Sequence, residues 1–199
     1  MDKHLIIFIK NPELGKAKTR IAKTMGDEKA LAIYKELLQH TLDTTLKVDC
    51  HRNLFYSEHI NREDQWSETD FIKQLQIEGG LGDKIKAAFD RVMEKADSCL
   101  IIGSDCGDMS KDILDKAFTA LQSHDVVLGP TFDGGYYLLG VSKPGLELYE
   151  GIAWSTETVY EQTLEKVKAA NATYFELPKL HDIDYEEDYL RWKNSLNKN

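Results

Sequence analysis

Short apolar runs alternate with amphipathic helical patterns through most of the 199-residue chain. Residues 4–9 and 98–102 consist mainly of apolar and β-branched residues, which is typical of strands buried on both faces of a parallel sheet. Residues 27–47 instead repeat apolar side chains every three or four positions, which predicts a helix with one buried stripe. Repeated strand–helix alternation predicts an α/β fold with a mainly parallel sheet.

The same patterns place the other elements along the chain. Leu75 and Ile77 are expected to point inward from one strand, and Ile85, Phe89 and Val92 to form the buried face of a helix. No break in composition divides the chain, so residues 1–199 are expected to form a single domain. The expected strands are 4–9, 52–57, 73–78, 98–102, 125–128, 134–141 and 174–177, and the expected helices are 27–47, 83–96, 111–122, 156–169 and 185–196.

Charge and cysteine content exclude several classes of protein. The formal net charge of −9 argues against a nucleic-acid binder, which usually has a basic face. Three widely spaced cysteines predict neither a disulfide framework nor a zinc site, and the histidines outside the late acidic segment show no ligand spacing. The first apolar run is too short for a signal peptide or a membrane span. We therefore expect a cytoplasmic protein with no membrane and no nucleic-acid partner.

The first expected strand ends in a basic loop, residues 10–20. This loop carries Gly15, Lys16, Lys18 and Arg20. Cations and free backbone N–H groups beside a helix favour phosphate, and the loop lacks the two-glycine frame of a Walker A sequence. The alternative is a solvated basic loop.

The strand 98–102 ends in Gly103-Ser104-Asp105-Cys106-Gly107-Asp108. Carboxylates directly after a buried strand suit Mg²⁺ or Mn²⁺ bridging phosphates, and Asp105 lies closest to the strand. The alternative is that Ser104 or Asp108 caps the next helix, and we expect Asp108 to be such a cap. Cys106 is expected to be a small filler residue, because no histidine partner is indicated nearby.

A third strand exit, residues 129–137, contains Asp133, Gly134, Gly135 and Tyr136. Glycines after an acid allow a ligand to approach the backbone, which makes this segment a candidate acceptor site. A strand-connecting turn with the tyrosines in the core explains the pattern equally well.

A late acidic segment, residues 181–188, contains Asp182 and Asp184. In an extended segment these two carboxylates point the same way, which predicts a second arm for a metal site. The alternative is an acidic cap and first turn of the last helix. That alternative suits residues 186–188 better than Asp182 and Asp184.

Taken in order, these segments resemble the small bacterial glycosyltransferase-like family of the nucleotide-diphospho-sugar transferase superfamily. The resemblance spans nearly the whole chain and depends on the ordered set rather than on any one motif. The matching segments are residues 8–12 with 15–20, 76–82, 103–106, 129–130 with 133–137, 151–156 and 182–184.

The resemblance implies a glycosyltransferase-A fold, a Rossmann-like three-layer sandwich, with distant relatives among the guanylyltransferases for molybdenum cofactor and for phospholactate. It implies that the first loop binds nucleotide phosphates through Lys10, Lys18 and Arg20. It places Gly82 near the base or sugar. It assigns the metal to Asp105, with Asp182 and Asp184 completing the site.

The chain departs from the family pattern at two positions. The family commonly has proline where this chain has Gly107, which we expect to loosen the loop after Asp105. It commonly has an acid where this chain has Phe132, which removes a polar group from the expected acceptor loop.

Together these features predict a metal-dependent transferase. Lys18, Arg20 and Asp105 are the expected catalytic residues. Gly15 and Ser104 add to the nucleotide site, with Mg²⁺ or Mn²⁺ as cofactor and a small molecule as acceptor. Glycosyl transfer from a nucleotide sugar and nucleotidyl transfer from a triphosphate both fit the residues. The alternatives are a non-catalytic nucleotide-binding regulatory protein and a cysteine-dependent enzyme using Cys106.

Overall fold

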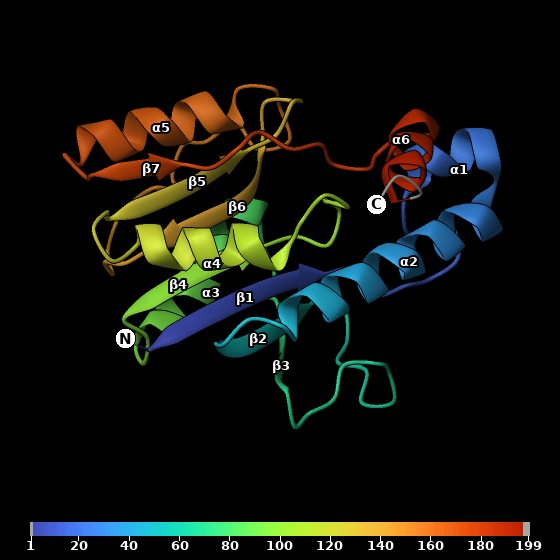
Figure 1. Cartoon of the computed structure of the whole chain (residues 1–199), viewed down its shortest axis with the longest axis horizontal. Coiled ribbons are helices and arrows are strands. Elements are labelled where there is room, and N and C mark those ends of the chain that lie inside the picture. The colour runs from blue at the N-terminus through green and yellow to red at the C-terminus, as the bar shows by residue number, and fades with distance from the viewer. Residues whose placement is uncertain (1, 197–199) are drawn as a thin grey trace.

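The computed structural model describes residues 2–196 and contains one seven-stranded sheet with helices on both sides (Figure 1). The strand order is β3-β2-β1-β4-β6-β5-β7. The elements are β1 (Lys3–Ile9), α1 (Thr19–Met25), α2 (Asp27–Thr45), β2 (His51–Tyr56), β3 (Phe71–Leu75), α3 (Leu81–Met93), β4 (Ser98–Ile102), α4 (Lys111–Ala120), β5 (Val126–Pro130), β6 (Tyr136–Val141), α5 (Val159–Ala169), β7 (Tyr174–Glu176) and α6 (Glu186–Leu196).

The sheet is mainly parallel, as predicted. Only β6 runs against its neighbours, β4 and β5. A parallel connection needs a crossover of a dozen or more residues, and only residues 131–135 lie between β5 and β6. The short turn therefore makes this pair an antiparallel hairpin. As a result, the start of β6 lies at the same edge of the sheet as the ends of β1, β4 and β5.

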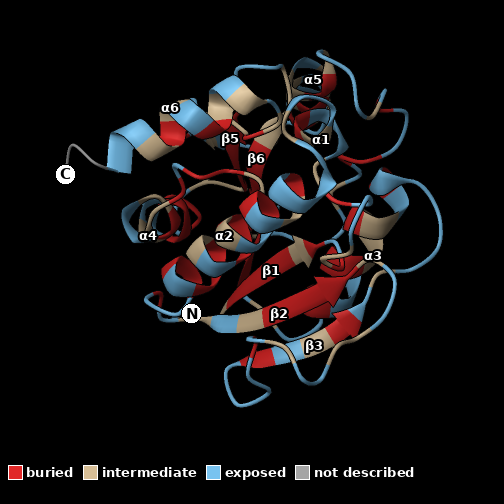
Figure 2. Ribbon diagram, turned by 90° about the vertical axis from the view of Figure 1, so that its right-hand side faces the viewer, coloured by how far each residue is buried: buried red, intermediate tan, exposed pale blue. Residues whose placement is uncertain are grey.

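Two apolar clusters sandwich the sheet, because successive side chains of a strand point to opposite faces. Leu5 and Ile7 pack with residues of α2 and α4 on one face, and Ile6 packs with residues of α3 and α5 on the other. Figure 2 shows the central strands β1 and β2 mainly in the colour of buried residues, whereas the edge strand β3 is partly exposed. A third cluster joins α1, α2 and α6 beside the sheet. This arrangement confirms the three-layer α/β architecture.

The patterned elements lie where the sequence predicts them to within a few residues, and the expected buried face of α3 is confirmed. A strand is present where β3 was predicted, but the predicted end of the strand and the inward orientation of Leu75 and Ile77 were wrong. The strand ends at Leu75, and both Leu75 and Ile77 are about half exposed (44% and 48%). Because β3 is an edge strand, Phe71 and Gln74 are the only residues it buries.

Helix α1 was not predicted from the sequence. It has seven residues, of which only Ile21 is buried, so no apolar period could mark it. It begins directly after the basic loop and packs on α2 and α6, and it thereby fixes where that loop lies. No described helix is both long enough and apolar enough to cross a membrane.

Candidate functional site

A cleft of about 860 Å³ opens at the carboxyl ends of β1 and β4, where α/β sheets commonly bind ligands. Its walls come from the basic loop, the start of α3, the loop after β4, the β5–β6 hairpin, the segment before α5 and the segment before α6. The predicted site residues that line it are Lys10, Lys18, Arg20, Ser104, Asp105, Asp133, Gly135, Tyr136, Asp182 and Asp184. The structure therefore brings together segments that are far apart in the sequence.

One backbone hydrogen bond joins the late acidic segment to the loop after β4. The N–H of Ile183 donates to the carbonyl of Asp105 at 2.9 Å, and the Ile183 side chain is buried. Because the residues on either side of Ile183 point away from the core, Asp182 and Asp184 face the cleft beside Asp105. The three predicted metal ligands thus line the same cleft, although Asp105 lies 77 positions before Asp182 in the sequence.

Lys18 lies between two of these carboxylates. Its ammonium group is 2.7 Å from Asp105 Oδ1 and 3.3 Å from Asp184 Oδ1, and its side chain is 5% exposed. Burial alone would lower the pKa of Lys18, but the charges of Asp105 and Asp184 outweigh burial and hold the pKa above its ordinary value. Lys18 therefore remains a cation between two anions.

The backbone at Lys18 explains how its side chain reaches this position. Its φ of 50° and ψ of 46° are left-handed, a conformation that costs a non-glycine residue of order 1 kcal/mol. Lys18 precedes the first residue of α1 and turns the chain from the loop into the helix. Arg20, two residues later, donates to Asp184 Oδ2 at 2.7 Å.

Asp182 differs from its neighbours. Among the described residues, Lys18 and Arg20 pair with Asp184 and neither pairs with Asp182. Burial, followed by the negative charges of Asp105, Asp133 and Asp184, raises the pKa of Asp182 to about 7, and Lys18 offsets only part of this. Asp182 is therefore a buried carboxylate whose charge Lys18 stabilises only in part.

Tyr34 of α2 contacts the segments that follow β1 and β4. Its hydroxyl accepts from the Lys10 N–H at 2.8 Å and lies 3.3 Å from Ser104 Oγ. The side chain is 2% exposed, and burial raises the pKa of this phenol well above its ordinary value. Ser104 is thus held by Tyr34 inside the cleft. The sequence showed Tyr34 only as one residue of an apolar helix stripe, so its contact with the site could not be predicted.

Asn11 fixes the first part of the basic loop. Its side chain donates to the His59 carbonyl at 2.9 Å and accepts from the Glu58 N–H at 3.0 Å, joining the loop to the segment after β2. Lys16 pairs with Glu58 and a second carboxylate at the rim. Gly15, predicted to bind nucleotide, has a φ of 76° and lies outside the cleft lining, where it serves the turn.

The β5–β6 hairpin forms another wall. Asp133 accepts hydrogen bonds from the Thr131 hydroxyl and the Gly135 N–H, so one of its oxygens holds the turn. A Cβ at Gly134 would lie 1.9 Å from the Glu157 carbonyl oxygen, and Gly134 faces this backbone rather than the cleft. Of the expected acceptor residues, Asp133, Gly135 and Tyr136 therefore line the cleft and Gly134 packs behind it.

The loop after β4 differs from the expectation at two positions. Asp108 does not cap the next helix: Ser110 is the residue before α4, and its hydroxyl accepts from the Ile113 N–H. Gly107 is buried, and a Cβ there would lie 2.6 Å from the Ile183 side chain and 2.7 Å from Trp192. Gly107 thus makes room for the late segment instead of loosening the loop.

Cys106 is buried in the same loop, and burial raises the pKa of its thiol well above its ordinary value. A buried thiol that stays protonated is a poor nucleophile. This agrees with the interpretation of Cys106 as a filler residue.

Trp154 and Lys84 also line the cleft, although neither was among the predicted site residues. Trp154 lines the wall beside Tyr136, and a Cβ at Gly82 would lie 2.5 Å from the Trp154 indole nitrogen. Gly82 is itself buried behind the lining, so it admits the tryptophan. Lys84, in the first turn of α3, adds a cation opposite the basic loop. The sequence signal that could have assigned Lys84 to the cleft was its position two residues after a glycine-rich turn.

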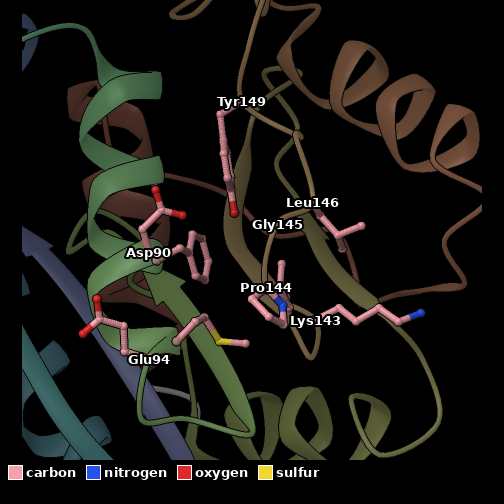
Figure 3. A pocket seen from close by; sticks show the side chains of 10 residues that line it. Asp90, Glu94, Lys143, Pro144, Gly145, Leu146 and Tyr149 are labelled. Atoms are coloured by element: carbon pink, nitrogen blue, oxygen red, sulfur yellow. The ribbon is translucent and has the colours of Figure 1, made fainter.

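A second, smaller pocket of about 300 Å³ lies between α3 and the loop after β6 (Figure 3). Its walls are mainly apolar, from Phe89, Met93, Leu146 and Tyr149, with Asp90 at its edge. It contains none of the predicted site residues. The chemistry predicted from the sequence is thus confined to the larger cleft.

Comparison with known proteins identifies the group to which this chain is similar. No curated protein shows significant sequence similarity to it. A solved structure from Desulfovibrio desulfuricans G20, provisionally described as a nucleotide-diphospho-sugar transferase, is 29% identical, with a TM-score of 0.90 over 100% of this chain and 89% of that chain.

Two more distant structures share the fold. CMP:2-keto-3-deoxy-manno-octonic acid synthetase complexed with CTP is 10% identical, with a TM-score of 0.62 over 100% of this chain and 99% of that chain. Rv0371c of Mycobacterium tuberculosis H37Rv, complexed with manganese, is 13% identical, with a TM-score of 0.56 over 98% and 100% of the two chains. These likenesses confirm the predicted glycosyltransferase-A type of fold and the resemblance to the nucleotide-diphospho-sugar transferase superfamily.

The amino-acid sequence matches a family over residues 41–156, which is more than half of the chain. This protein belongs to the family described as uncharacterized proteins conserved in bacteria, DUF2064.

Proposed function

We propose that this protein is a metal-dependent transferase that binds a nucleotide donor in the cleft and transfers a glycosyl or nucleotidyl group to a small acceptor. The observation that carries the proposal is that Asp105, Asp182 and Asp184 line one cleft, where Lys18 pairs with Asp105 and Asp184 and Arg20 pairs with Asp184. Carboxylates for a metal and cations for phosphate then lie at one end of a sheet.

The three carboxylates fit a hard divalent cation. All of their donor atoms are oxygens, which suit Mg²⁺ or Mn²⁺. Burial and then the neighbouring carboxylates raise the pKa of Asp182, and a divalent cation would favour its ionised form. Asp105, Asp182 and Asp184 would hold such an ion, and the ion would supply positive charge that stabilises the leaving pyrophosphate or nucleoside diphosphate. The manganese complex of Rv0371c, which has the same fold, supports this choice of ion.

The cations supply the phosphate site. Lys18 and Arg20 reach the carboxylates from one wall of the cleft, and Lys84 lies on the opposite wall. Donor phosphates placed between these walls would receive charge-assisted hydrogen bonds from both sides. The CTP complex of the octonic acid synthetase, with the same fold, supports a nucleotide as the ligand of this fold.

The acceptor enters along the hairpin wall. Tyr136 and Trp154 present aromatic surface there, with their ring centroids 6.3 Å apart. The second carboxylate oxygen of Asp133 is available to accept a hydrogen bond from the acceptor substrate. In this site the protein contributes positioning and electrostatic stabilisation rather than covalent chemistry. Glycosyl and nucleotidyl transfer place the same demands on these residues.

A thermal-shift screen of nucleoside triphosphates and nucleotide sugars, each with Mn²⁺ or with EDTA, tests the proposal. A ligand that binds the native state raises the midpoint of unfolding. We expect one donor class to raise it in the presence of Mn²⁺ and to lose most of the effect in EDTA. Tight nucleotide binding that ignores EDTA would instead support the non-catalytic regulatory alternative.

Product analysis with the best donor then separates the two reactions. Nucleotidyl transfer releases pyrophosphate, whereas glycosyl transfer releases a nucleoside diphosphate. The Asp105→Ala variant serves as the control, because it should fold and yet lose metal-dependent binding. Wild-type Mn²⁺ dependence in this variant would refute the metal assignment.

A further inference from the structure

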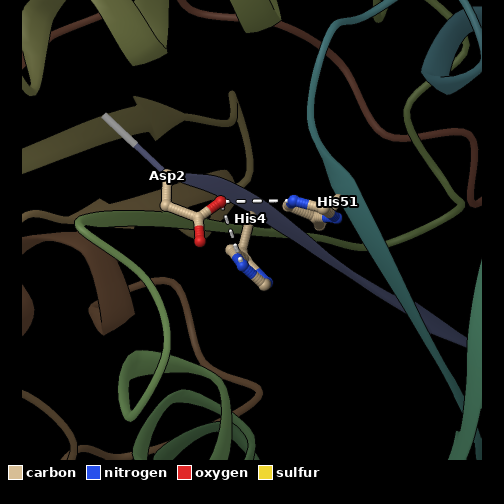
Figure 4. Close-up of side chains that lie close together, drawn as sticks. All are labelled: Asp2, His4 and His51. Carbon is tan, nitrogen blue, oxygen red and sulfur yellow. Dashed lines mark ion pairs between the residues drawn. The ribbon is translucent and has the colours of Figure 1, made fainter.

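A second cluster of metal-ligating side chains lies at the amino end of the sheet, opposite the cleft. Asp2, His4 and His51 each offer a ligand atom, and these atoms all lie within 4.8 Å of one another (Figure 4). His4 and His51 are register partners of the parallel strands β1 and β2, so the sheet itself sets them side by side. None of the three takes part in the proposed transfer reaction.

The distances approach those of a metal site. Asp2 Oδ1 lies 3.3 Å from His51 Nε2 and 3.6 Å from His4 Nε2. Ligands about 2.0–2.1 Å from a tetrahedral ion are about 3.3 Å apart. Two of the three ligand separations therefore need to change by only a few tenths of an ångström, and the imidazole pair closes around an ion by side-chain rotation.

The backbone holds Asp2 in place before any ion binds. Its N–H donates to Asp97 Oδ2 at 2.7 Å, and its carbonyl accepts from the N–H groups of Asp97 and Ser98 at 3.0 and 3.2 Å. These bonds tie Asp2 to the start of β4. The side chains of Asp2 and His51 are 48% and 64% exposed, so an ion can reach them from solvent.

His4 is buried and has a partner on its second nitrogen. His4 Nδ1 lies 3.2 Å from Asn53 Nδ2, and Asn53 Oδ1 accepts from Gln74 Nε2 at 3.2 Å. A histidine that ligates through Nε2 carries its proton on Nδ1 and donates it to an acceptor. Asn53 provides that acceptor when its amide turns by half a rotation.

Gln74 is the next amide in this chain of contacts. Its Oε1 is buried and has no hydrogen-bond partner among the described residues. When Asn53 and Gln74 both turn, Asn53 Nδ2 donates to Gln74 Oε1, and Asn53 Oδ1 accepts from His4 Nδ1. The orientation of an amide is assigned from its hydrogen-bond network, and both arrangements occupy the same volume. The turn exchanges Gln74 Oε1 for Gln74 Nε2 as the unpartnered group, so it adds no unpartnered group while it gives His4 Nδ1 an acceptor.

We propose that Asp2, His4 and His51 form a site for Zn²⁺, with Asn53 and Gln74 as its supporting hydrogen-bond relay and a fourth position open to solvent. Two imidazoles and one carboxylate suit zinc, whereas the all-oxygen set of the cleft suits Mg²⁺ or Mn²⁺. The ion joins β1 to β2 directly and to β4 through the backbone of Asp2. Its role is to stabilise the amino end of the sheet.

The test uses full-length protein without a histidine tag, stripped with a chelator and kept in excess Mg²⁺ to occupy oxygen-only sites. Zn²⁺ is titrated and counted per chain, and Co²⁺ is used as a spectroscopic substitute for zinc bound by nitrogen and oxygen. We expect one Zn²⁺ per chain, a visible Co²⁺ absorption band that Zn²⁺ removes, and a higher unfolding temperature with Zn²⁺.

Two exposed ligands permit variants that should fold. His51→Ala and Asp2→Asn should each weaken Zn²⁺ binding at least tenfold and remove the thermal stabilisation. His59→Ala is the matched control: His59 is similarly exposed and lies 4.0 Å from the Glu13 carboxylate. It should bind Zn²⁺ as the wild type does.

Three results would overturn the zinc site. These are no stoichiometric binding by the wild type, wild-type affinity in both ligand variants, and loss of the bound zinc on Asp105→Asn instead. The last result would assign the zinc to the cleft. None of the three depends on whether the protein catalyses transfer.

Discussion

Two aspartates at opposite ends of the sheet have pKa values that shift in opposite directions. At the carboxyl end, burial and the neighbouring carboxylates raise the pKa of Asp182 to about 7. At the amino end, hydrogen bonds from Thr173 and the ammonium of Lys143 lower the pKa of Asp125 to about 2. The fold supplies Asp125 with hydrogen-bond donors and a cation, whereas Lys18 offsets only part of the effect of burial on Asp182.

This difference separates a binding site from a structural contact. Asp125 precedes β5 and fastens it to the residue before β7 through the backbone and hydroxyl of Thr173. Asp182 is held in place by the fold although its charge is unfavourable there, which is a pattern common at functional sites. The predictions below change one end of the sheet at a time.

The largest expected effect is on turnover, from Asp105→Asn. This change removes the carboxylate charge nearest the end of β4 and should lower the transfer rate by roughly 10²–10³-fold, as the loss of one electrostatic contact to the reacting groups commonly does. The matched control is Asp108→Asn, an exposed aspartate in the same loop. Initial rates with the donor found in the screen measure both variants, and equal losses in the two would remove the special role of Asp105.

The Lys18→Met variant tests whether the Lys18 ammonium group offsets the negative charges of Asp105 and Asp184. Without metal, the variant leaves Asp105 and Asp184 without their shared ammonium, which should lower the free energy of unfolding by about 1–3 kcal/mol. Mn²⁺ should restore more stability to the variant than to the wild type, because no ammonium group competes for the oxygens. Turnover should still fall, since Lys18 also serves the phosphates.

Denaturant unfolding with and without Mn²⁺ measures both effects of this change. Lys16→Met is the control: Lys16 lies in the same loop but is 55% exposed at the rim. Exposed ion pairs contribute about 0–1 kcal/mol, so this control should change little in either condition. A Lys18 variant as stable as the wild type without metal would contradict the charge balance inferred for the cleft.

Asp182→Asn should stabilise the metal-free protein at neutral pH and above. The pKa of Asp182 is raised in the folded state, so between about pH 4 and 7 the folded state binds more protons than the unfolded state. The free energy of unfolding therefore falls as pH rises through this window. The variant should lose this slope and gain about 1–3 kcal/mol at pH 8, by an order-of-magnitude conversion of the shift.

Urea unfolding from pH 4 to pH 8 measures the slope. The same variant should bind Mn²⁺ more weakly, so stability and metal affinity move in opposite directions. If the variant were less stable than the wild type at pH 8, Asp182 would be a structural residue like Asp125.

The sequence predicts a region well when the region depends on residues close together in the chain, and poorly when it depends on contacts between distant segments. The strands and their exits follow from local apolar patterns, which is why Asp105 and the basic loop could be placed at the carboxyl edge. The position of β6 follows from a turn too short for a crossover. Local patterns failed at β3. An edge strand needs only one buried face, and Leu75 and Ile77 are not among the residues that β3 buries.

Contacts between distant segments could not be predicted from spacing. His4 and His51 are 47 positions apart, and only the register of β1 on β2 makes them neighbours. Tyr34 reaches Ser104 because α2 crosses beneath both strand exits. The ammonium of Lys18 between two carboxylates depends on a left-handed backbone residue, which no side-chain pattern announces.

The smallest effect is expected from Asp125→Asn, the counterpart of Asp182→Asn at the amino end. The pKa of Asp125 is lowered in the folded state, so its contribution to stability is complete above about pH 4 and is lost as pH falls through about 2. Because Lys143 is largely exposed and solvent screens this pair, we expect the variant to lose only about 1 kcal/mol at pH 7. Urea unfolding at pH 7 and pH 3 measures the loss, which should shrink at the lower pH as the wild-type carboxylate begins to protonate. Since Asp125→Asn and Asp182→Asn remove the same charge, opposite signs of their stability changes at pH 7–8 would establish the contrast between the two ends, and equal signs would refute it.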